Sequence, residues 1–195
     1  YLLIDNGANV EYRPEHLVQF ATLGSIYAEK GFGFQNPRVG LLSNGEEEGK
    51  GNDLVKETAP LLKAEPINFI GNIEPKEAFE GGVDVLVTDG FTGNVMLKTT
   101  EAVAMMLYGV MKEAMTSTLL STLGALLVKP SLKPLKEMLD PDTVGAALLV
   151  GVDGLVFIGH GRASALAVTN SLKFAAQTAA SDLLPSLRDM IAERF

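Results

Sequence analysis

Four glycine-rich turns carry the side chains that are best suited to chemistry in this chain. Each turn follows a short run of mostly apolar residues, and the run at residues 83–88 is rich in β-branched side chains, which is typical of a strand that ends in a tight turn. Such turns, and the helix starts that follow them, gather free backbone N–H groups around an anion. Four such junctions favour an α/β enzyme that handles an anion. The turns are residues 6–9, 44–51, 89–94 and 159–161.

Lys50 and Asn94 are the strongest candidates for catalysis among the residues of these turns. Lys50 is the only lysine in the four turns, and glycines on both sides let the backbone approach a ligand. It could pair with phosphate or polarise a carbonyl, or it could be a solvated lysine paired with residues 46–48. Asn94 stands where a helix is expected to begin, so it could donate to an oxyanion or simply cap that helix.

Three further polar residues lie at expected strand ends. Asp5 and Asp89 could hold a metal, a substrate hydroxyl or Lys50, although such residues commonly cap a turn or a helix. His160 lies between two glycines and could act as an acid or base, or be a hydrogen-bonded structural histidine. His16, in the first turn of an expected helix, is interpreted as structural.

The sequence gives little support for nucleotide binding, for metal binding or for a covalent acyl-enzyme on cysteine. The glycine-rich turns match neither the phosphate-binding loop of nucleotide hydrolases nor the dinucleotide-binding fingerprint. The chain has no cysteine, and its two histidines are not spaced as metal ligands. We therefore expect no metal and no cofactor.

An alternation of strands and helices positions these residues. It indicates a mostly parallel sheet with helices on both faces, in which ligands bind beyond the carboxyl ends of the strands. The four turns should then share one sheet edge. The expected strands are residues 1–5, 38–43, 67–70, 83–88 and 155–158. The expected helices are residues 15–30, 53–63 with Asn52 as N-cap, 95–116, and 163–195 with a break at Pro185.

Residues 115–139 combine leucines with lysines and are expected to form two short amphipathic helices joined at Lys129-Pro130. This composition suits a hairpin that lies on a membrane or packs against a second subunit, although an ordinary helical pair would have the same pattern. The candidates for membrane contact are Leu123, Leu126, Leu127 and Val128.

Composition sets further limits. A chain of 195 residues with 47% hydrophobic residues can form one domain with a sizeable core, so we expect a single α/β domain over residues 1–195. The net charge of −8 argues against nucleic-acid binding, which needs a basic face. The chain opens without Met inside a strand-like run, which we interpret as the C-terminal portion of a longer protein.

Ordered sequence blocks resemble the phosphate:acyl-ACP acyltransferase family of fatty acid and phospholipid synthesis (the PlsX family) over nearly the whole chain. Where that family usually has serines after the last His-Gly pair, this chain has Arg162 and Ala163. The matching blocks are residues 3–10, 13–17, 37–42, 48–52, 68–72, 88–95, 97–99 and 160–161.

The resemblance implies a fold, a reaction and partners. The fold would be a three-layer α/β/α arrangement like that of isocitrate and isopropylmalate dehydrogenases, with residues 115–139 as a protruding helical hairpin. The reaction would convert acyl-ACP and inorganic phosphate into acyl phosphate and ACP, in bacterial phospholipid synthesis. The protein would be a cytoplasmic homodimer, peripherally associated with the membrane.

The resemblance also assigns site residues. Lys50 and Asn94 would be catalytic. Basic residues that could dock the acidic carrier protein are Lys112, Lys129, Lys133, Lys136 and Arg162. The positions for phosphate or substrate are Asp5, Asn6, Gly7, Asn9, Gly49, Gly51, Asp89, Gly90, Gly93 and His160.

Three other functions remain open. A phosphotransacetylase-type enzyme would use acyl-CoA instead of acyl-ACP. A metal-dependent hydroxy-acid dehydrogenase shares the fold class but needs an Asp cluster and a nicotinamide site, which we cannot assemble here. A membrane-binding scaffold would have no catalytic activity.

Overall fold

The computed structural model describes residues 1–9, 11–139, 141–143 and 145–194, and gives only the backbone for residues 135–139, 141 and 194. The chain divides into two compact units. The first unit contains Tyr1–Val95, Leu149–Val156 and Ala176–Phe195, and the second contains Met96–Leu148 and Phe157–Ala175.

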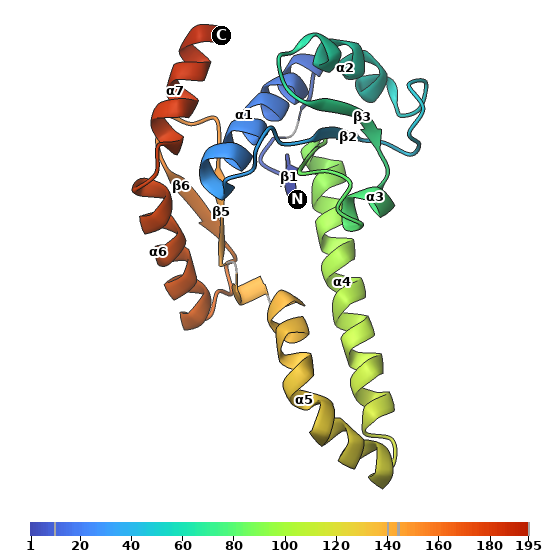
Figure 1. Ribbon diagram of the computed structural model, residues 1–195. Coiled ribbons are helices and arrows are strands. Elements are labelled where there is room, and N and C mark those ends of the chain that lie inside the picture. Colours follow the sequence, from blue (N-terminus) through green and yellow to red (C-terminus); the bar gives the residue numbers. More distant parts are fainter. Residues whose placement is uncertain (10, 140, 144, 195) are drawn as a thin grey trace. The chain divides into compact units, whose positions relative to one another are not determined.

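A four-stranded parallel sheet forms the centre of the first unit (Figure 1). Its strands are β1 (Leu2–Ile4), β4 (Val85–Val87), β2 (Val39–Leu42) and β3 (Phe69–Ile73), in that spatial order. Ile4 and Leu41 both pair with Val87, so β1, β4 and β2 end level with one another. The predicted mostly parallel sheet is therefore confirmed, and three of the four glycine-rich turns leave the same edge.

Helix α1 (Pro14–Phe32) covers this sheet and packs against β1, β4, α2 (Asp53–Ala64) and α7 (Leu183–Arg194). Pro14 opens α1, and Gly33 closes it with a positive φ of 74°, a conformation that glycine adopts without strain. The Asn52 side chain accepts a hydrogen bond from the Val55 N–H at 3.0 Å, which confirms the predicted cap of α2.

The hydrophobic core of the first unit lies between α1, α2 and the sheet. Each of its central side chains is inaccessible to solvent, which is the state that the β-branched strand runs predict. The fully buried residues are Leu17, Ala21, Ala28, Val39, Leu41, Leu62, Val85 and Val87.

Two elements of the first unit differ from the prediction. Strand β3 reaches Ile73 instead of ending at residue 70, because Asn72 and Ile73 continue the ladder with Leu41 and Leu42. The short helix α3 (Pro75–Phe79) was not predicted. Glu74 and Glu77 start it through a reciprocal cap, a local signal that sequence reasoning missed.

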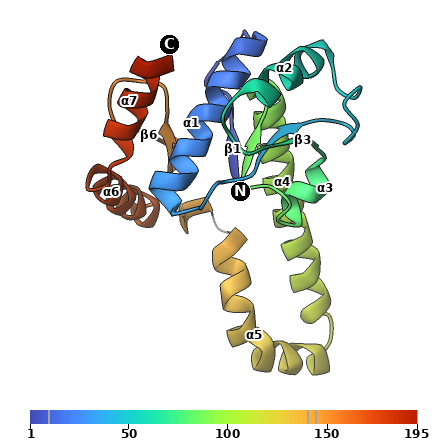
Figure 2. The same cartoon turned by 45° about the horizontal axis from the view of Figure 1, so that its top comes forward.

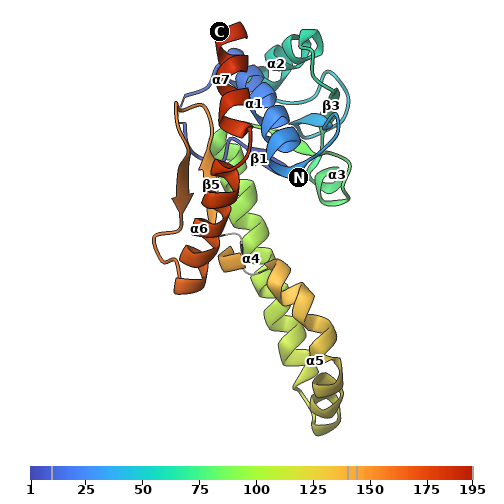
Figure 3. The same cartoon turned by 60° about the vertical axis from the view of Figure 1, so that its left-hand side comes forward.

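The second unit begins within α4 (Gly90–Met115) and continues through α5 (Leu119–Leu139), a 3₁₀ turn (Pro141–Thr143), β5 (Ala146–Leu149), β6 (Val156–Gly159) and α6 (Ala165–Ala179). Figures 2 and 3 show α4 and α5 meeting at residues 116–118. Among the described residues, no helix is long and apolar enough to cross a membrane.

Helix α5 corrects the prediction of two short helices joined at Lys129-Pro130. It is one helix with Pro130 and Pro134 inside it, since a proline removes one hydrogen bond without necessarily ending the helix. The break lies instead at Thr118. The backbone N–H of Thr118 donates to Ser121 Oγ at 2.9 Å, and the N–H of Ser121 donates to Thr118 Oγ1 at 3.1 Å.

The last predicted strand is also placed differently. Strand β6 pairs with β5, which was not predicted, in a separate two-stranded sheet. The turn at residues 159–161 therefore does not share the edge of the four-stranded sheet, and the prediction that all four turns do so is wrong.

The C-terminal helical stretch breaks at residues 180–182 and not at Pro185. Pro185 lies in the first turn of α7, where a backbone N–H would have no partner within the helix. The first helical hydrogen bond of α7 comes one residue later, where the Ser186 N–H donates to the Asp182 carbonyl at 3.1 Å.

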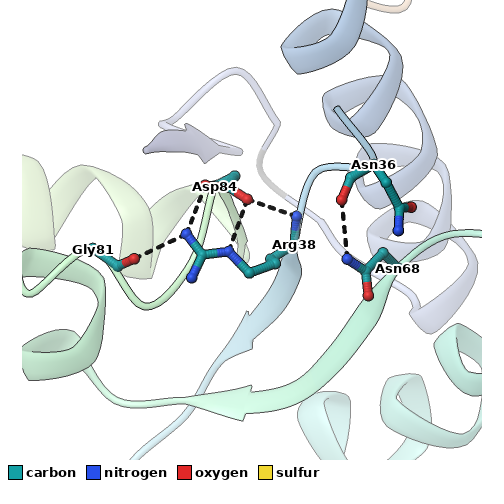
Figure 4. A network of polar contacts seen from close by, with 5 residues as sticks. All are labelled: Asn36, Arg38, Asn68, Gly81 and Asp84. Carbon is teal, nitrogen blue, oxygen red and sulfur yellow. Dashed lines mark hydrogen bonds and ion pairs between the residues drawn. The ribbon is translucent and has the colours of Figure 1, made fainter. Parts of the chain in front are cut away.

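Arg38 and Asp84 connect the starts of β2 and β4, at the end of the sheet opposite the glycine-rich turns (Figure 4). The Arg38 backbone N–H, Nε and Nη2 donate to the Asp84 carboxylate at 2.8, 3.0 and 2.9 Å. The side-chain hydrogen bond from Arg38 holds the pKa of Asp84 below its usual value, although burial of the carboxyl acts in the opposite direction.

We predict that Asp84→Asn lowers the free energy of unfolding by about 1–2 kcal/mol at pH 7, because solvent screens part of this pair. A lowered folded-state pKa gives stability that is present above the unfolded value of about 3.9 and is lost as the pH falls through the folded value. In urea titrations below about pH 4, the free energies of unfolding of Asp84→Asn and wild type should therefore approach each other.

Asp153→Asn is the matched control for this prediction. Asp153 also pairs with an arginine, Arg188, at 2.7 Å, but its side chain is 83% exposed. Exposed ion pairs contribute little to stability, so the free energy of unfolding of this variant should stay close to that of wild type. An equal effect of the two substitutions would contradict the structural role assigned to Asp84.

Candidate functional site

Asp5 organises the turn at residues 6–9. Its carboxylate is 6% exposed, and Oδ1 accepts hydrogen bonds from the backbone N–H groups of Asn6, Gly7 and Ala8, the last two at 2.9 Å. Oδ2 accepts from the backbone N–H of Asn9 at 3.0 Å and from its Nδ2 at 2.8 Å. The carboxylate thus takes the place that an external anion would occupy, and these N–H groups are not presented to phosphate.

These contacts set the charge state of Asp5. Burial acts to raise the pKa of its carboxyl, but the hydrogen bonds from Ala8, Asn9 and Asn6 outweigh burial and keep the pKa below its usual value. Asp5 is therefore a negative charge fixed inside the turn. This is the capping role that the sequence left open for it.

Tyr12 is a residue of this region that sequence reasoning missed. Its hydroxyl donates to the Asn9 carbonyl at 2.5 Å and lies 3.3 Å from Asp5 Oδ2. Burial raises the pKa of the Tyr12 hydroxyl, and the charge of Asp5 acts in the same direction, whereas the Gly90 N–H lowers it. No spacing rule links a tyrosine to a turn three residues earlier, so the sequence offered no signal.

Helix α4 begins directly against this turn. Asp89 caps it, accepting the Thr92 N–H at 2.9 Å and the Thr92 hydroxyl at 2.6 Å. The helix therefore starts at Gly90, and the prediction that it starts near Val95 is wrong. A Cβ at Gly90 would lie 2.7 Å from the Gly7 nitrogen, and one at Gly93 would lie 2.0 Å from the Asp5 carbonyl oxygen.

Asn94 lies within the first turns of α4 and is not its N-cap, since Asp89 has that role. Its Nδ2 would be 3.0 Å from a Cβ at Gly7, so its amide lies beside the turn at residues 6–9. Within the described part of the chain, the Asn94 side chain forms no hydrogen bond. Its amide is therefore free to donate to a ligand.

Lys50 lies at the end of the loop formed by residues 44–51, which follows β2 and is called the Lys50 loop below. The Gly51 N–H donates to Asn44 Oδ1 at 2.9 Å and closes the loop. Among the residues that the structure describes, Lys50 forms no ion pair, because Glu48 pairs with Lys63 instead. The interpretation of Lys50 as a partner of residues 46–48 is therefore not supported.

The glycines of the Lys50 loop have different surroundings. Gly45 faces the stem of Lys50, since a Cβ there would lie 2.7 Å from Lys50 Cγ. Gly51 has a positive φ of 98°, which a residue with a side chain rarely adopts. Gly49 has open space around it.

The structure brings together most, but not all, of the predicted site. The turns at residues 6–9 and 89–94 touch, and the Lys50 loop leaves the same sheet edge. His160 belongs to the second unit, where it is exposed and its carbonyl accepts the Ala163 N–H at 3.0 Å. Its role in a site stays a prediction.

The site contains cation and amide donors but no cluster of metal ligands. Over the described ranges, no group of three or more histidine, aspartate and glutamate side chains is placed to hold a metal ion. A cavity of about 250 Å³ lies beside the Lys50 loop, between α2 and β3, and Glu46, Lys63 and Asn72 are among its lining residues. Lys50 is a candidate to bind an anion and Asn94 a candidate to stabilise an oxyanion, since both follow strands that end at the same sheet edge.

Comparison with known proteins identifies the class. A family described as fatty acid synthesis protein matches residues 1–185, so the chain belongs to this family. It is 49% identical to the phosphate acyltransferase of Elusimicrobium minutum over 192 residues, which are 98% of this chain and 56% of that protein. The family resemblance predicted from the sequence blocks is confirmed.

Two further relatives give the same result. The chain is 48% identical to the phosphate acyltransferase of Carboxydothermus hydrogenoformans over 95% of its length, and 47% identical to that of Aquifex aeolicus over 98%. It spans 56% and 58% of those two proteins, so it corresponds to little more than half the length of these relatives.

We predict that Gly93→Ala destabilises the protein by about 1–3 kcal/mol, because its methyl group would overlap the Asp5 carbonyl oxygen. The better helix propensity of alanine offsets only part of this cost. The free energy of unfolding in urea, compared between Gly93→Ala and wild type, measures this cost. The control is Gly49→Ala, where the added methyl meets no other group, and it should stay within about 0.5 kcal/mol of wild type. Equal stabilities would contradict the close approach of the turn to α4.

Proposed function

We propose that the protein containing this chain is a bacterial phosphate acyltransferase that converts acyl-ACP and inorganic phosphate into acyl phosphate and ACP. The observation that carries this proposal is that Lys50 and Asn94 follow adjacent strands at one sheet edge, and that neither side chain forms a hydrogen bond or ion pair with the described residues. The phosphate acyltransferases among its relatives support the acyl-transfer chemistry. The product acyl phosphate would feed phospholipid synthesis.

The proposed reaction needs no cofactor and no acyl-enzyme. A phosphate oxygen attacks the thioester carbonyl carbon, the carbonyl oxygen becomes an oxyanion, and collapse of the intermediate breaks the C–S bond. The carrier leaves as a thiolate and takes up a proton. Lys50 would hold the phosphate next to the carbonyl, and Asn94 would donate to the oxyanion.

The other predicted site residues divide into two proposed roles. Asp5, Gly7, Asn9, Asp89, Gly90 and Gly93 would form the frame, because their contacts are made within the turns. Gly49, His160 and the side chain of Asn6 would contact phosphate or the acyl donor. Gly51, whose N–H donates to Asn44, would support the loop beside them.

We also propose the finer features that the family resemblance implies. The fold would be of the three-layer, isocitrate dehydrogenase-like type, and α4 and α5 would form its protruding hairpin. Apolar side chains on α5 are exposed, with Leu119 and Leu127 at 86% and 83%, which supports peripheral contact with a membrane from the cytoplasm. Exposed apolar residues of α4, such as Met105, suit contact with a second subunit of a homodimer.

Basic residues near these helices are proposed to dock the acidic carrier protein. Lys112 is in the last turn of α4, and Lys129 and Lys133 are in α5. Arg162 is exposed and follows β6. The side chain of Lys136 lies outside the described residues.

The test is phosphate-dependent release of the carrier thiol from long-chain acyl-ACP by the full-length enzyme. Lys50→Ala and Asn94→Ala should each lower kcat/KM by about 100-fold or more, as loss of one oxyanion donor does in other acyl-transfer sites. Lys56→Ala is the control, because Lys56 is exposed on α2 and should leave the rate near wild type.

Three results would overturn the proposal. Undiminished turnover by Lys50→Ala would mean that Lys50 has no part in catalysis. Preferential use of acyl-CoA would favour a phosphotransacetylase-type enzyme, and liposome binding without any turnover would favour a scaffold.

A further inference from the structure

Asn72, in β3, is a buried polar residue whose side chain is only partly satisfied. It is 7% exposed, and its Nδ2 donates to the Glu47 carbonyl at 3.0 Å. Its Oδ1 is buried and has no hydrogen-bond partner among the described residues. An unpaired buried oxygen destabilises a fold by about 1–3 kcal/mol, so a leucine of similar size would be the more stabilising choice here. The stability of the sheet therefore does not explain this side chain.

The Glu47 carbonyl that Asn72 holds is the closing point of the Lys50 loop. The same oxygen accepts the backbone N–H of Lys50 at 2.9 Å. One carbonyl with two lone pairs thus joins β3, through Asn72, to the backbone of Lys50. Asn44 closes the loop a second time by accepting the Gly51 N–H at 2.9 Å.

The stem of Lys50 is guided separately. It lies against Gly45, where a Cβ would be 2.7 Å from Lys50 Cγ and 3.2 Å from Cδ. The backbone of Lys50 is therefore fixed through Asn72 and Glu47, and its stem by the space at Gly45. The ammonium group forms no ion pair with any described residue, so the surrounding contacts orient Lys50 without neutralising it.

We propose that Asn72 is a positioning residue that acts through the Glu47 carbonyl to hold Lys50 in its reactive place. This proposal rests on the proposed function of Lys50 in phosphate binding. The hydrogen bond that Asn72 donates to the Lys50 loop explains why an asparagine lies at this buried position although its oxygen has no partner among the described residues.

The test compares Asn72→Leu with wild type in the full-length enzyme. The substitution removes the donor at similar volume, so the melting temperature should be unchanged or higher, whereas KM for phosphate should rise and kcat/KM should fall by about 10- to 100-fold. KM for the acyl donor should not change. In a Lys50→Ala background, Asn72→Leu should cause no further loss, since the residue that it positions is absent.

Ser43→Ala is the matched control. Ser43 is also buried, its Oγ also lacks a partner among the described residues, and it lies on the same sheet face because Leu41 pairs with Asn72. It makes no side-chain hydrogen bond to the Lys50 loop, so the rate should stay near that of wild type. If Ser43→Ala and Asn72→Leu reduce kcat/KM equally, burial and not the Glu47 contact matters, and the proposal is wrong.

Hydrogen exchange of the Lys50 backbone amide gives a readout that does not depend on catalysis. Asn72→Leu should speed this exchange about 10-fold relative to wild type, while exchange in β2 stays unchanged. Unchanged exchange at Lys50 would overturn the proposal even in an active enzyme. If Asn72→Leu speeds this exchange but the wild-type protein shows no phosphate-dependent turnover, the loop contact is supported and the proposed function is refuted. Should Asn72→Leu fail to fold, Asn72→Ala removes the same donor and carries the same expectations for KM and for amide exchange, although its smaller side chain should lower the melting temperature.

Discussion

The carboxylate of Asp5 is the interaction on which the geometry of the site depends. It gathers the backbone N–H groups of the exposed residues 6–9 and so fixes the shape of the turn beside the sheet. Because the turn is satisfied from within and contains Gly7, the first residues of α4 can pack directly on it. The position of Asn94, in the first turns of α4, thus depends on the carboxylate that follows β1.

This internal anion also explains how charge is distributed at the sheet edge. A second anion would be repelled by Asp5 unless a cation lay nearby, and the turn itself supplies none. In the proposed site the cation would come from the Lys50 loop, which follows β2, and β4 lies between β2 and β1. Glu48 pairs with Lys63, so Lys50 keeps its charge available although glutamates precede it and the chain carries a net charge of −8.

Local signals in the sequence predicted the parts of the fold that depend on neighbouring residues. The β-branched runs gave the four parallel strands, and Asn52 gave the start of α2. The start of α4 was placed too late because Asp89 and Thr92 were not interpreted as a cap. The hydrogen bond from Asn72 to the Glu47 carbonyl joins distant segments and left no local pattern, so it could not be predicted. The contact of Tyr12 with Asn9 and the pairing of β5 with β6 are closer in sequence, but no motif marks them.

The order of the strands has a consequence for how these 195 residues behave by themselves. Within the described chain, β1 and β3 are the outer strands of the four-stranded sheet, so each has a row of backbone N–H and C=O groups without a strand on one side. Such rows act as templates for any other extended segment. When this segment is studied by itself, the edge strands of two molecules can pair with each other. Such self-association competes with the monomer as the protein concentration rises.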